Sequence, residues 1–412
     1  MNISNNPFSA NGINYSPAEK PIVVICIDGS ADEYLDTTMA FDRMPNLKKM
    51  ATSGYRGMVR GALPSFTNVN NSSIVTGVSP AVHGISGNFF YDADKDQEVM
   101  MNSAEYLRAE TLLAAASNAG RKVAVVTAKE KLRDILSHKM KGIAFSAEKA
   151  NQAKRETHGI DNVEEVTGHK TPAIYSGDAS LFVLRAGIAL IEKGLADFLY
   201  LSLTDYMQHT YSPEAEESLA FYEAMDTEIG KLLQLGAIVG ATADHGMNSK
   251  IKPDGSPNVL FVEDMLEEKF GNGFRVICPI TDPYVKHHGA LGSYVVVHIN
   301  DKSIINDVKN WLAIQPGITE VHDKVTATRL LEQPEDRTGD LVVLSARDVV
   351  VGRRPQYHDL SALDSTLRSH GGRYEEMVPM IISHPLNAAY KIKAAADPRN
   401  FDIFDFTING TN

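Results

Sequence analysis

The sequence has few cysteines, no long apolar run and no excess of basic residues, and each absence excludes a class of protein. Its 412 residues include two cysteines, Cys26 and Cys278, which are too few for a disulfide framework and do not form a C-x-x-C pair. Cys26 lies within an apolar run, where cysteine usually serves as a small core side chain. No apolar stretch approaches the roughly 20 residues that span a bilayer, so we do not expect a membrane-spanning protein.

Acidic residues outnumber basic ones by 52 to 40, which gives a formal net charge of −12. This charge argues against non-specific binding to nucleic acid and to anionic membrane surfaces. A small anionic substrate stays open, because bound metal cations can reverse the field inside a cleft. The first 20 residues are polar and lack the basic and apolar segments of a signal peptide, so we expect a cytoplasmic protein. The sequence leaves a homodimer open.

Short apolar runs alternate with amphipathic stretches along most of the chain. The predicted strands are 22–27, 123–127, 198–203, 237–243 and 378–382, and the predicted helices include 110–118, 180–193 and 216–233. This alternation is typical of an α/β fold with a mainly parallel sheet covered by helices on both faces. Such sheets bind ligands beyond the carboxyl ends of their strands, which is where the polar residues of interest follow.

The stretch between about residues 250 and 367 breaks this pattern. Segments 294–299 and 341–345 resemble strands of a separate small sheet, and 304–312 resembles a helix. The chain is long enough for one large domain with an insertion. We therefore predict an α+β cap insertion at 251–367 and a catalytic core formed by 1–250 and 368–412, to within about ten residues.

Carboxylates and histidines follow several of the predicted strands. Asp205 and His209 are four residues apart, so one helical turn would place both on one face, whereas Asp244 and His245 are adjacent and suit a tight loop. Mixed carboxylate and imidazole ligands favour zinc, with manganese or iron as alternatives. Each feature alone has an ordinary explanation, such as a helix cap or a surface pair. Their joint occurrence at strand ends, with Asp28 after strand 22–27, indicates bound metal ions.

Thr67 follows a proline-containing loop and precedes a predicted helix, at the position of an N-cap residue. The dipole and free N–H groups of a helix N-terminus favour an alkoxide and an incoming phosphoryl anion. A threonine hydroxyl is a poor nucleophile near neutral pH, and metal coordination is one way to activate it. The alternative is that Thr67 is only a helix cap.

Together these segments resemble the alkaline phosphatase superfamily, in particular its nucleotide pyrophosphatase/phosphodiesterase-like branch. The motifs that carry the resemblance are Asp28-Gly29, Thr67-Asn68, Ile74-Val75-Thr76-Gly77, His83-Gly84-Ile85, Asn88, Asp205 with His209, Asp244-His245-Gly246 and Ser369-His370-Gly371-Gly372. They span most of the chain and leave only the predicted cap unmatched.

The resemblance implies a role for each of these residues. One zinc ion would be held by Asp205, His209 and His370, and a second by Asp28, Asp244 and His245, with Thr67 as the metal-coordinated nucleophile. Two such ions roughly 4 Å apart stabilise the attacking and leaving groups of an in-line displacement at phosphorus. Asn88 and the backbone N–H of Asn68 would hold a phosphoryl oxygen, and His83 would fix a loop.

A lysine pair suggests which phosphorus compound is attacked. Lys129 and Lys131 follow strand 123–127, and an extended chain would project both to the same side. The alternative is a solvated helix start with ordinary surface lysines. The segment resembles that of the branch member that splits a carbon–phosphorus bond, which implies the hydrolysis of phosphonoacetate to acetate and phosphate. The lysines would then stabilise the charge that develops on the leaving carbanion, and either lysine or water would protonate it.

Three other readings stay open at this point. A phosphodiesterase or nucleotide pyrophosphatase would use the same metals, and a phosphosugar mutase of the superfamily would usually carry serine in place of Thr67. A non-catalytic metal-binding relative would have lost a ligand or the nucleophile. Arg275, Lys286 and His287 of the predicted cap are candidates for closing over a substrate carboxylate.

Overall fold

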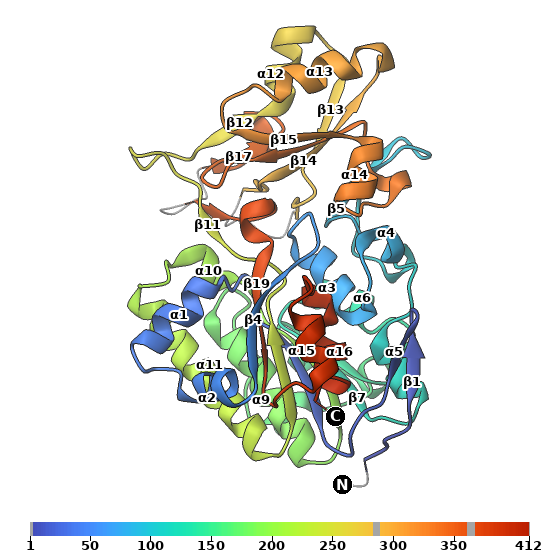
Figure 1. The fold of residues 1–412 in the computed structure, drawn as a ribbon, viewed down its shortest axis with the longest axis vertical. Coiled ribbons are helices and arrows are strands. Elements are labelled where there is room, and N and C mark those ends of the chain that lie inside the picture. The colour runs from blue at the N-terminus through green and yellow to red at the C-terminus, as the bar shows by residue number, and fades with distance from the viewer. Residues whose placement is uncertain (1–2, 283–288, 361–366, 412) are drawn as a thin grey trace.

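A seven-stranded sheet forms the centre of the larger part of the molecule, in a computed structural model that describes residues 3–282, 289–360 and 367–411 (Figure 1). Its strands, in spatial order, are β4 (Tyr55–Arg60), β19 (Met377–Ile382), β10 (Ile238–Thr242), β3 (Ile22–Cys26), β9 (Phe198–Ser202), β7 (Val123–Thr127) and β8 (Gly142–Ser146). Neighbours from β10 to β8 pair in parallel, whereas β19 is antiparallel to both β10 and β4. The predicted α/β class is confirmed.

The five predicted strands are all present, but the sheet contains two more, and one strand runs in the unexpected direction. We expected 378–382 to join a parallel sheet, and β19 is antiparallel. An apolar run reads the same in both directions, so the sequence pattern could not show this. The unpredicted strands β4 and β8 lie at the two edges of the sheet, where strands carry more polar and small residues.

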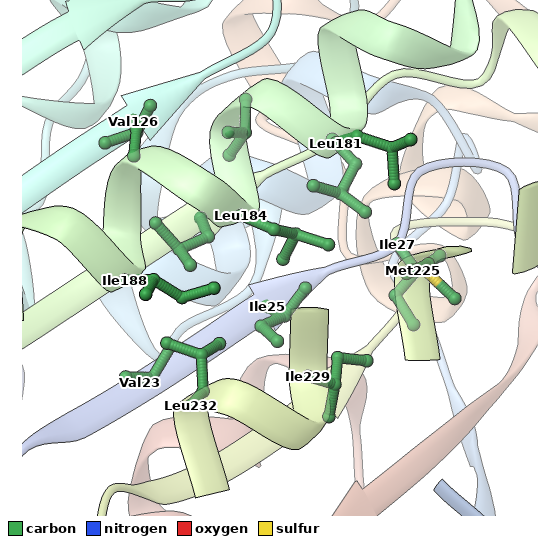
Figure 2. Close-up of a cluster of buried hydrophobic side chains, with 14 of the residues drawn as sticks. Val23, Ile25, Ile27, Val126, Leu181, Leu184, Ile188, Met225, Ile229 and Leu232 are labelled. Atoms are coloured by element: carbon green, nitrogen blue, oxygen red, sulfur yellow. The ribbon is translucent and has the colours of Figure 1, made fainter. Parts of the chain in front are cut away.

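Alternate residues of β3 pack into two different hydrophobic clusters, one on each face of the sheet. Val23 and Ile25 point to the face covered by helices α9 (Gly177–Glu192) and α11 (Glu216–Gln234), as Figure 2 shows. Ile22 and Val24 belong to the cluster on the opposite face. Because successive side chains of a strand point to opposite faces, burial on both faces requires the continuous apolar run that the sequence shows.

Helices cover both faces of the sheet, as predicted. The face with α9 and α11 also carries α1 (Asp32–Ala40) and α2 (Pro45–Ser53); the other face carries α3 (Thr67–Thr76), α5 (Leu112–Asn118), α6 (Glu130–Leu136) and α16 (Ile403–Ile408). Shorter helices are α4 (Pro80–His83), α7 (Arg155–His158), α8 (Val163–Thr167), α10 (Tyr206–Thr210) and α15 (Ala388–Ala394). Among the helices of the described residues, none combines the length and apolar character needed to cross a bilayer.

A second, smaller sheet lies above the first, at the top of Figure 1. Its antiparallel strands are β13 (Phe274–Ile277), β14 (Tyr294–Ile299), β16 (Leu341–Ser345) and β15 (Ile318–Asp323), with helices α12 (Val262–Phe270), α13 (Ile305–Leu312) and α14 (Lys324–Leu330) beside them. We call this sheet and its helices the cap. All of it falls within the predicted insertion 251–367, whose boundaries stay a prediction.

The cap and the central sheet are connected through packing and through short strand pairs. Phe66, which precedes α3, belongs to the hydrophobic cluster of the cap, and its ring meets the Tyr294 ring edge-on at 6.4 Å. Two short strand pairs lie between them: β11 (Asn248–Ser249) with β18 (Arg368–Ser369), which joins the segments that flank the predicted insertion, and β5 (Phe89–Asp92) with β6 (Gln97–Met100), whose Phe89 and Tyr91 pack against the cap. The other short pairs are β12 (Val259–Phe261) with β17 (Val350–Gly352), inside the predicted insertion, and β1 (Phe8–Ala10) with β2 (Ile13–Tyr15), near the N-terminus. The start of α3 is therefore held between the two sheets.

Candidate active site

Both predicted ligand sets come together at the carboxyl ends of strands of the central sheet. Asp28 follows β3, Asp205 follows β9, and Asp244 with His245 follows β10. One group consists of Asp205, His209 and His370, and the other of Asp28, Asp244 and His245; within each, the potential ligand atoms lie within 4.8 Å of one another. All six side chains are buried.

The first group has the predicted one-turn geometry. The His209 N–H donates to the Asp205 carbonyl at 2.9 Å at the start of α10, and His209 Nε2 lies 2.9 Å from Asp205 Oδ2. His370 Nε2 lies 3.9 Å from the same oxygen. The turn after β3 approaches this group closely: Gly29 has φ +70°, and a Cβ there would lie 2.9 Å from the Asp205 Cβ. Glycine at position 29 therefore lets the two groups lie side by side.

Each histidine ring is fixed by a backbone carbonyl. The bonds run from His209 Nδ1 to Arg368 O at 2.8 Å, from His245 Nδ1 to Gly246 O at 2.8 Å, and from His370 Nδ1 to Ser65 O at 2.7 Å. A carbonyl only accepts, so Nδ1 carries the proton and Nε2 is left to bind a cation. The His245 and His370 rings stack at 3.5 Å and 6°, which joins the two groups.

The charges of the site call for bound cations. Among the described residues, neither carboxylate oxygen of Asp28 accepts a hydrogen bond, and His245 Nε2 lies 3.3 Å from Oδ1. Burial, together with the charges of Asp205 and Asp244, raises the pKa of Asp28 well above its ordinary value. Carboxylates buried this close together are stable as anions only when cations neutralise them. The donor set therefore fits metal ions.

Thr67 is the first residue of α3, so its place in the helix differs from the prediction. Phe66, with an extended backbone, occupies the N-cap position, and the Thr67 side chain caps no helical N–H. Thr67 Oγ1 lies instead 3.4 Å from His245 Nε2 and faces the second group. Asn68 is the second residue of the helix, where a backbone N–H has no partner within the helix.

Asn68 and Asn88 are both buried and are linked through one residue. The Asn68 side chain donates to the Met101 carbonyl at 3.2 Å, and the Met101 N–H donates to the Asn88 carbonyl at 2.7 Å. The Asn88 amide donates to Ile280 O at 3.3 Å, while its Oδ1 accepts no hydrogen bond from any described residue. Their role in holding a phosphoryl oxygen stays a prediction.

The lysine pair lies at a helix start, and both lysines are largely buried. Lys129 directly precedes α6 and Lys131 lies in its first turn, so the expectation of an extended segment is wrong. The alternative of solvated lysines is also wrong, because their side chains are 16% and 19% exposed. Both line a cavity of about 320 Å³, together with Tyr175 and Asp282.

Each lysine of the pair meets a carboxylate. Lys129 Nζ lies 3.0 Å from Asp205 Oδ1, and Lys131 pairs with Asp282. Burial alone would lower the pKa of Lys129, but the charges of Asp205 and Asp28 raise it above its ordinary value. Burial and the charge of Lys129 lower the pKa of Lys131 to about 7, against the opposing charges of Asp205 and Asp28. The two ammonium groups therefore sit in different electrostatic environments.

Comparison with known proteins agrees with this arrangement. The family described as type I phosphodiesterase / nucleotide pyrophosphatase matches residues 22–373, from β3 to just past His370. The chain belongs to this family. Membership confirms the predicted resemblance and the prediction of a hydrolase.

Solved structures extend the match to the whole chain. Phosphonoacetate hydrolase from Sinorhizobium meliloti 1021 in complex with phosphonoformate is 42% identical, with a TM-score of 0.93 and coverage of 99% of this chain and 100% of that one. The same enzyme in complex with phosphonoacetate also gives a TM-score of 0.93. Murine ectonucleotide pyrophosphatase / phosphodiesterase 5 shares the fold, with a TM-score of 0.63 at 15% identity over 95% of this chain and 96% of that one.

Curated relatives match over a shorter stretch. Ectonucleotide pyrophosphatase/phosphodiesterase family member 3 of Bos taurus is 35% identical over 86 residues, which are 21% of this chain and 10% of that protein. The chain thus spans about a tenth of the length of the curated relatives that it matches.

Sequence reasoning missed two polar residues that support the site. Asn71 donates from Nδ2 to Asp244 Oδ2 at 3.1 Å, and its Oδ1 accepts from the Tyr200 hydroxyl at 2.7 Å. Asn71 lies four residues after Thr67, so its place on the same helix face was a usable signal. Asp282, the partner of Lys131, gave no signal, because it comes from a distant segment of the chain.

Of the three cap residues predicted to close over a substrate carboxylate, only Arg275 lies within the described residues. The Arg275 guanidinium stacks on the Tyr91 ring at 4.0 Å and pairs with Asp96, so its charge is directed at the β5–β6 hairpin. Lys286 and His287 lie outside the described residues.

His83 has the contacts expected of a residue that fixes a loop. Its Nε2 donates to Ser73 Oγ at 2.8 Å, and its Nδ1 accepts the Ile85 N–H at 3.1 Å. Burial lowers the pKa of His83 to about 3, so the ring is neutral at ordinary pH.

Acid should therefore weaken the fold through His83. The pKa of His83 is lower in the folded chain than the value of about 6.5 of an unfolded one, so the stability from its neutral ring is present above about pH 6.5 and is lost as the pH falls towards 3. We expect the difference in free energy of unfolding between wild type and His83→Gln to shrink by up to about 1.4 kcal/mol per pH unit below pH 6. Urea unfolding at several pH values measures this, and a constant difference would contradict it.

Proposed function

We propose that this protein is a two-zinc hydrolase that cleaves the carbon–phosphorus bond of phosphonoacetate, through a phosphothreonine intermediate on Thr67. One observation carries the proposal. The Thr67 hydroxyl lies against one candidate ligand group, while Lys129 contacts the other group and lines a cavity with Lys131. A hydroxyl, sites for two cations and a pocket with two lysines in its wall are thus adjacent.

The donor set supports zinc at both groups, with manganese or iron as alternatives. One ion would be held by Asp205, His209 and His370, and the other by Asp28, Asp244 and His245. Bound ions would lower the pKa of a coordinated hydroxyl and stabilise negative charge on the attacking and leaving atoms.

The first half of the reaction transfers the phosphoryl group to Thr67. Having lost its proton, Thr67 Oγ1 attacks phosphorus in line, so that an oxygen–phosphorus bond forms as the carbon–phosphorus bond breaks. The bonding electrons pass to the acetate carbon and delocalise into its carboxylate, where Lys129 and Lys131 would stabilise the added charge. A proton from either lysine or from water completes acetate. Asn88 and the Asn68 N–H would hold a phosphoryl oxygen throughout.

The second half releases phosphate and restores the enzyme. A water molecule attacks the phosphothreonine at the group formed by Asp205, His209 and His370, the bond between Thr67 Oγ1 and phosphorus breaks, and the Thr67 oxygen regains a proton. Net consumption is one water per phosphonoacetate, with acetate and phosphate as products.

A phosphodiesterase or nucleotide pyrophosphatase is the main alternative, and the family name supports it. Two observations favour the phosphonate. The enzyme that matches over the whole chain binds phosphonoacetate in its solved structure, and the buried lysine pair suits a carboxylate-bearing leaving group. An intact Thr67 argues against a non-catalytic relative. We also propose that the enzyme is cytoplasmic and binds neither nucleic acid nor membrane surfaces. A homodimer stays an open prediction.

Replacing Thr67 tests the nucleophile. Thr67→Ala should lower turnover of phosphonoacetate at least about a thousandfold, because no hydroxyl is left to accept the phosphoryl group. Metal analysis should still find close to two ions per chain. Thr76→Ala, a control in the same helix whose hydroxyl donates to the Ser72 and Ser73 carbonyls of that helix, should retain turnover. Undiminished activity of Thr67→Ala, or one ion or none in the wild type, would count against the proposal.

Replacing Lys131 tests the assignment of the leaving group. Lys131→Ala should lower kcat/KM for phosphonoacetate about a hundredfold, but should lower that for a nitrophenyl ester less than about tenfold, because the ester has a stable leaving group. Lys149→Ala removes an exposed lysine from the wall of the same cavity and should affect both substrates little. Equal losses of both activities in Lys131→Ala would show that the lysine only attracts anionic substrates and does not stabilise the leaving group specifically.

A further inference from the structure

A buried ion pair lies behind the two loops that carry His245 and His370. Lys250 Nζ lies 2.8 Å from Glu375 Oε1, and both side chains are 0% exposed. Lys250 also donates to Ser293 Oγ at 2.8 Å and to Arg347 O at 2.6 Å, so all three of its ammonium hydrogens have acceptors. Asn248 donates a further hydrogen bond to Glu375 Oε1 at 2.6 Å. The network is fully satisfied, which makes it rigid.

Glu375 contacts both histidine loops directly. Its backbone carbonyl accepts the N–H of Gly246, the residue after His245, at 2.8 Å. Its carboxylate Oε2 accepts the N–H of Gly372, two residues after His370, at 3.1 Å. One residue thus sets the path of both loops.

Lys250 acts on the His370 loop from the other side. Its partner Ser293 donates its backbone N–H to the His370 carbonyl at 2.9 Å. On the far side of the same loop, the Ser65 hydroxyl donates to the Gly372 carbonyl at 2.9 Å, and the Ser65 carbonyl accepts from the His370 ring. Rotation or shift of His370 would therefore break contacts on both sides of its loop.

We propose that Lys250 and Glu375 are positioning residues that hold the stacked rings of His245 and His370 in the arrangement that two metal ions require. The inference rests on the proposed function only in taking the two ligand groups as zinc sites. A buried ion pair contributes little net stability compared with a well-packed apolar pair, because desolvation offsets its attraction. Its effect here is geometric, since the Glu375 carboxylate binds Asn248, three residues after His245, and Gly372, two residues after His370.

The test compares two buried ion pairs at opposite ends of the central sheet. Arg121 Nε and Asp197 Oδ1 form the matched control pair at 2.7 Å, with side chains 0% and 2% exposed, at the amino ends of β7 and β9. Glu375→Gln should weaken zinc binding about 10- to 100-fold at one group or both, the effect expected for partners of metal ligands. Asp197→Asn should leave zinc affinity within about twofold, because it is far from the groups. Chelator competition measures the affinities, and thermal unfolding of the metal-free proteins compares their stabilities.

A gentler variant covers the case in which Glu375→Gln does not fold. Glu375→Asp keeps the charge but shortens the reach towards Gly372, and it should weaken zinc binding by a smaller but measurable factor, about threefold or more. If the variants of both pairs lower Tm by similar amounts and leave zinc affinity unchanged, the role of the pair is purely structural and the inference is overturned. Because zinc is measured without substrate, a wild type that binds two zinc ions but releases no phosphate from phosphonoacetate would overturn the proposed function alone.

Discussion

Three buried carboxylates at the carboxyl ends of the central strands are the constraint on which the rest of the site depends. Asp28, Asp205 and Asp244 each follow a strand. Because β3, β9 and β10 run in parallel, their carboxyl ends lie at the same end of the sheet, and so do the three carboxylates. All three side chains are buried, so their mutual repulsion needs positive charge beside them. Lys129 supplies part of that charge at Asp205, and the arrangement of the histidines fits metal ions that supply the rest.

The surrounding polar contacts keep this charged cluster in one geometry. A backbone carbonyl holds each histidine ring, Asn71 holds Asp244, and the Lys250–Glu375 pair lies behind two of the histidine loops. Thr67 is held differently, by the apolar packing of its neighbour Phe66. Phe66, directly before Thr67, is buried in the cluster of the cap, and a Cβ at Gly371, which has φ +122°, would lie 2.4 Å from its ring. The cap therefore helps to position the Thr67 hydroxyl.

The sequence predicted the parts of the molecule that local patterns determine. Buried strands are apolar runs in the sequence. The boundaries predicted from such runs agree to within a residue with those of β3, β7, β9, β10, β14 and β16. Residues that follow such strands, together with the i, i+4 pair of Asp205 and His209, indicated bound metal ions. The division of the ligands into two groups, with His370 in one of them, came from the family resemblance. What the patterns could not give was direction and long-range contact. The antiparallel course of β19, the pairing of Lys131 with Asp282 and the network of Lys250 all depend on segments far apart in the chain. The helix start at Lys129 was only the alternative interpretation, because one extended residue before a helix resembles the end of a strand.

The central claim is that the reactive hydroxyl is directed at carbon-bound phosphorus, and the identity of the preferred substrate tests it most directly. Phosphate release from phosphonoacetate should be compared with nitrophenol release from a nitrophenyl phosphodiester, with the zinc-loaded protein and the same enzyme preparation. We expect kcat/KM to be higher for phosphonoacetate. A strong preference for the diester would contradict it and would assign the same metals and the same threonine to phosphodiester hydrolysis.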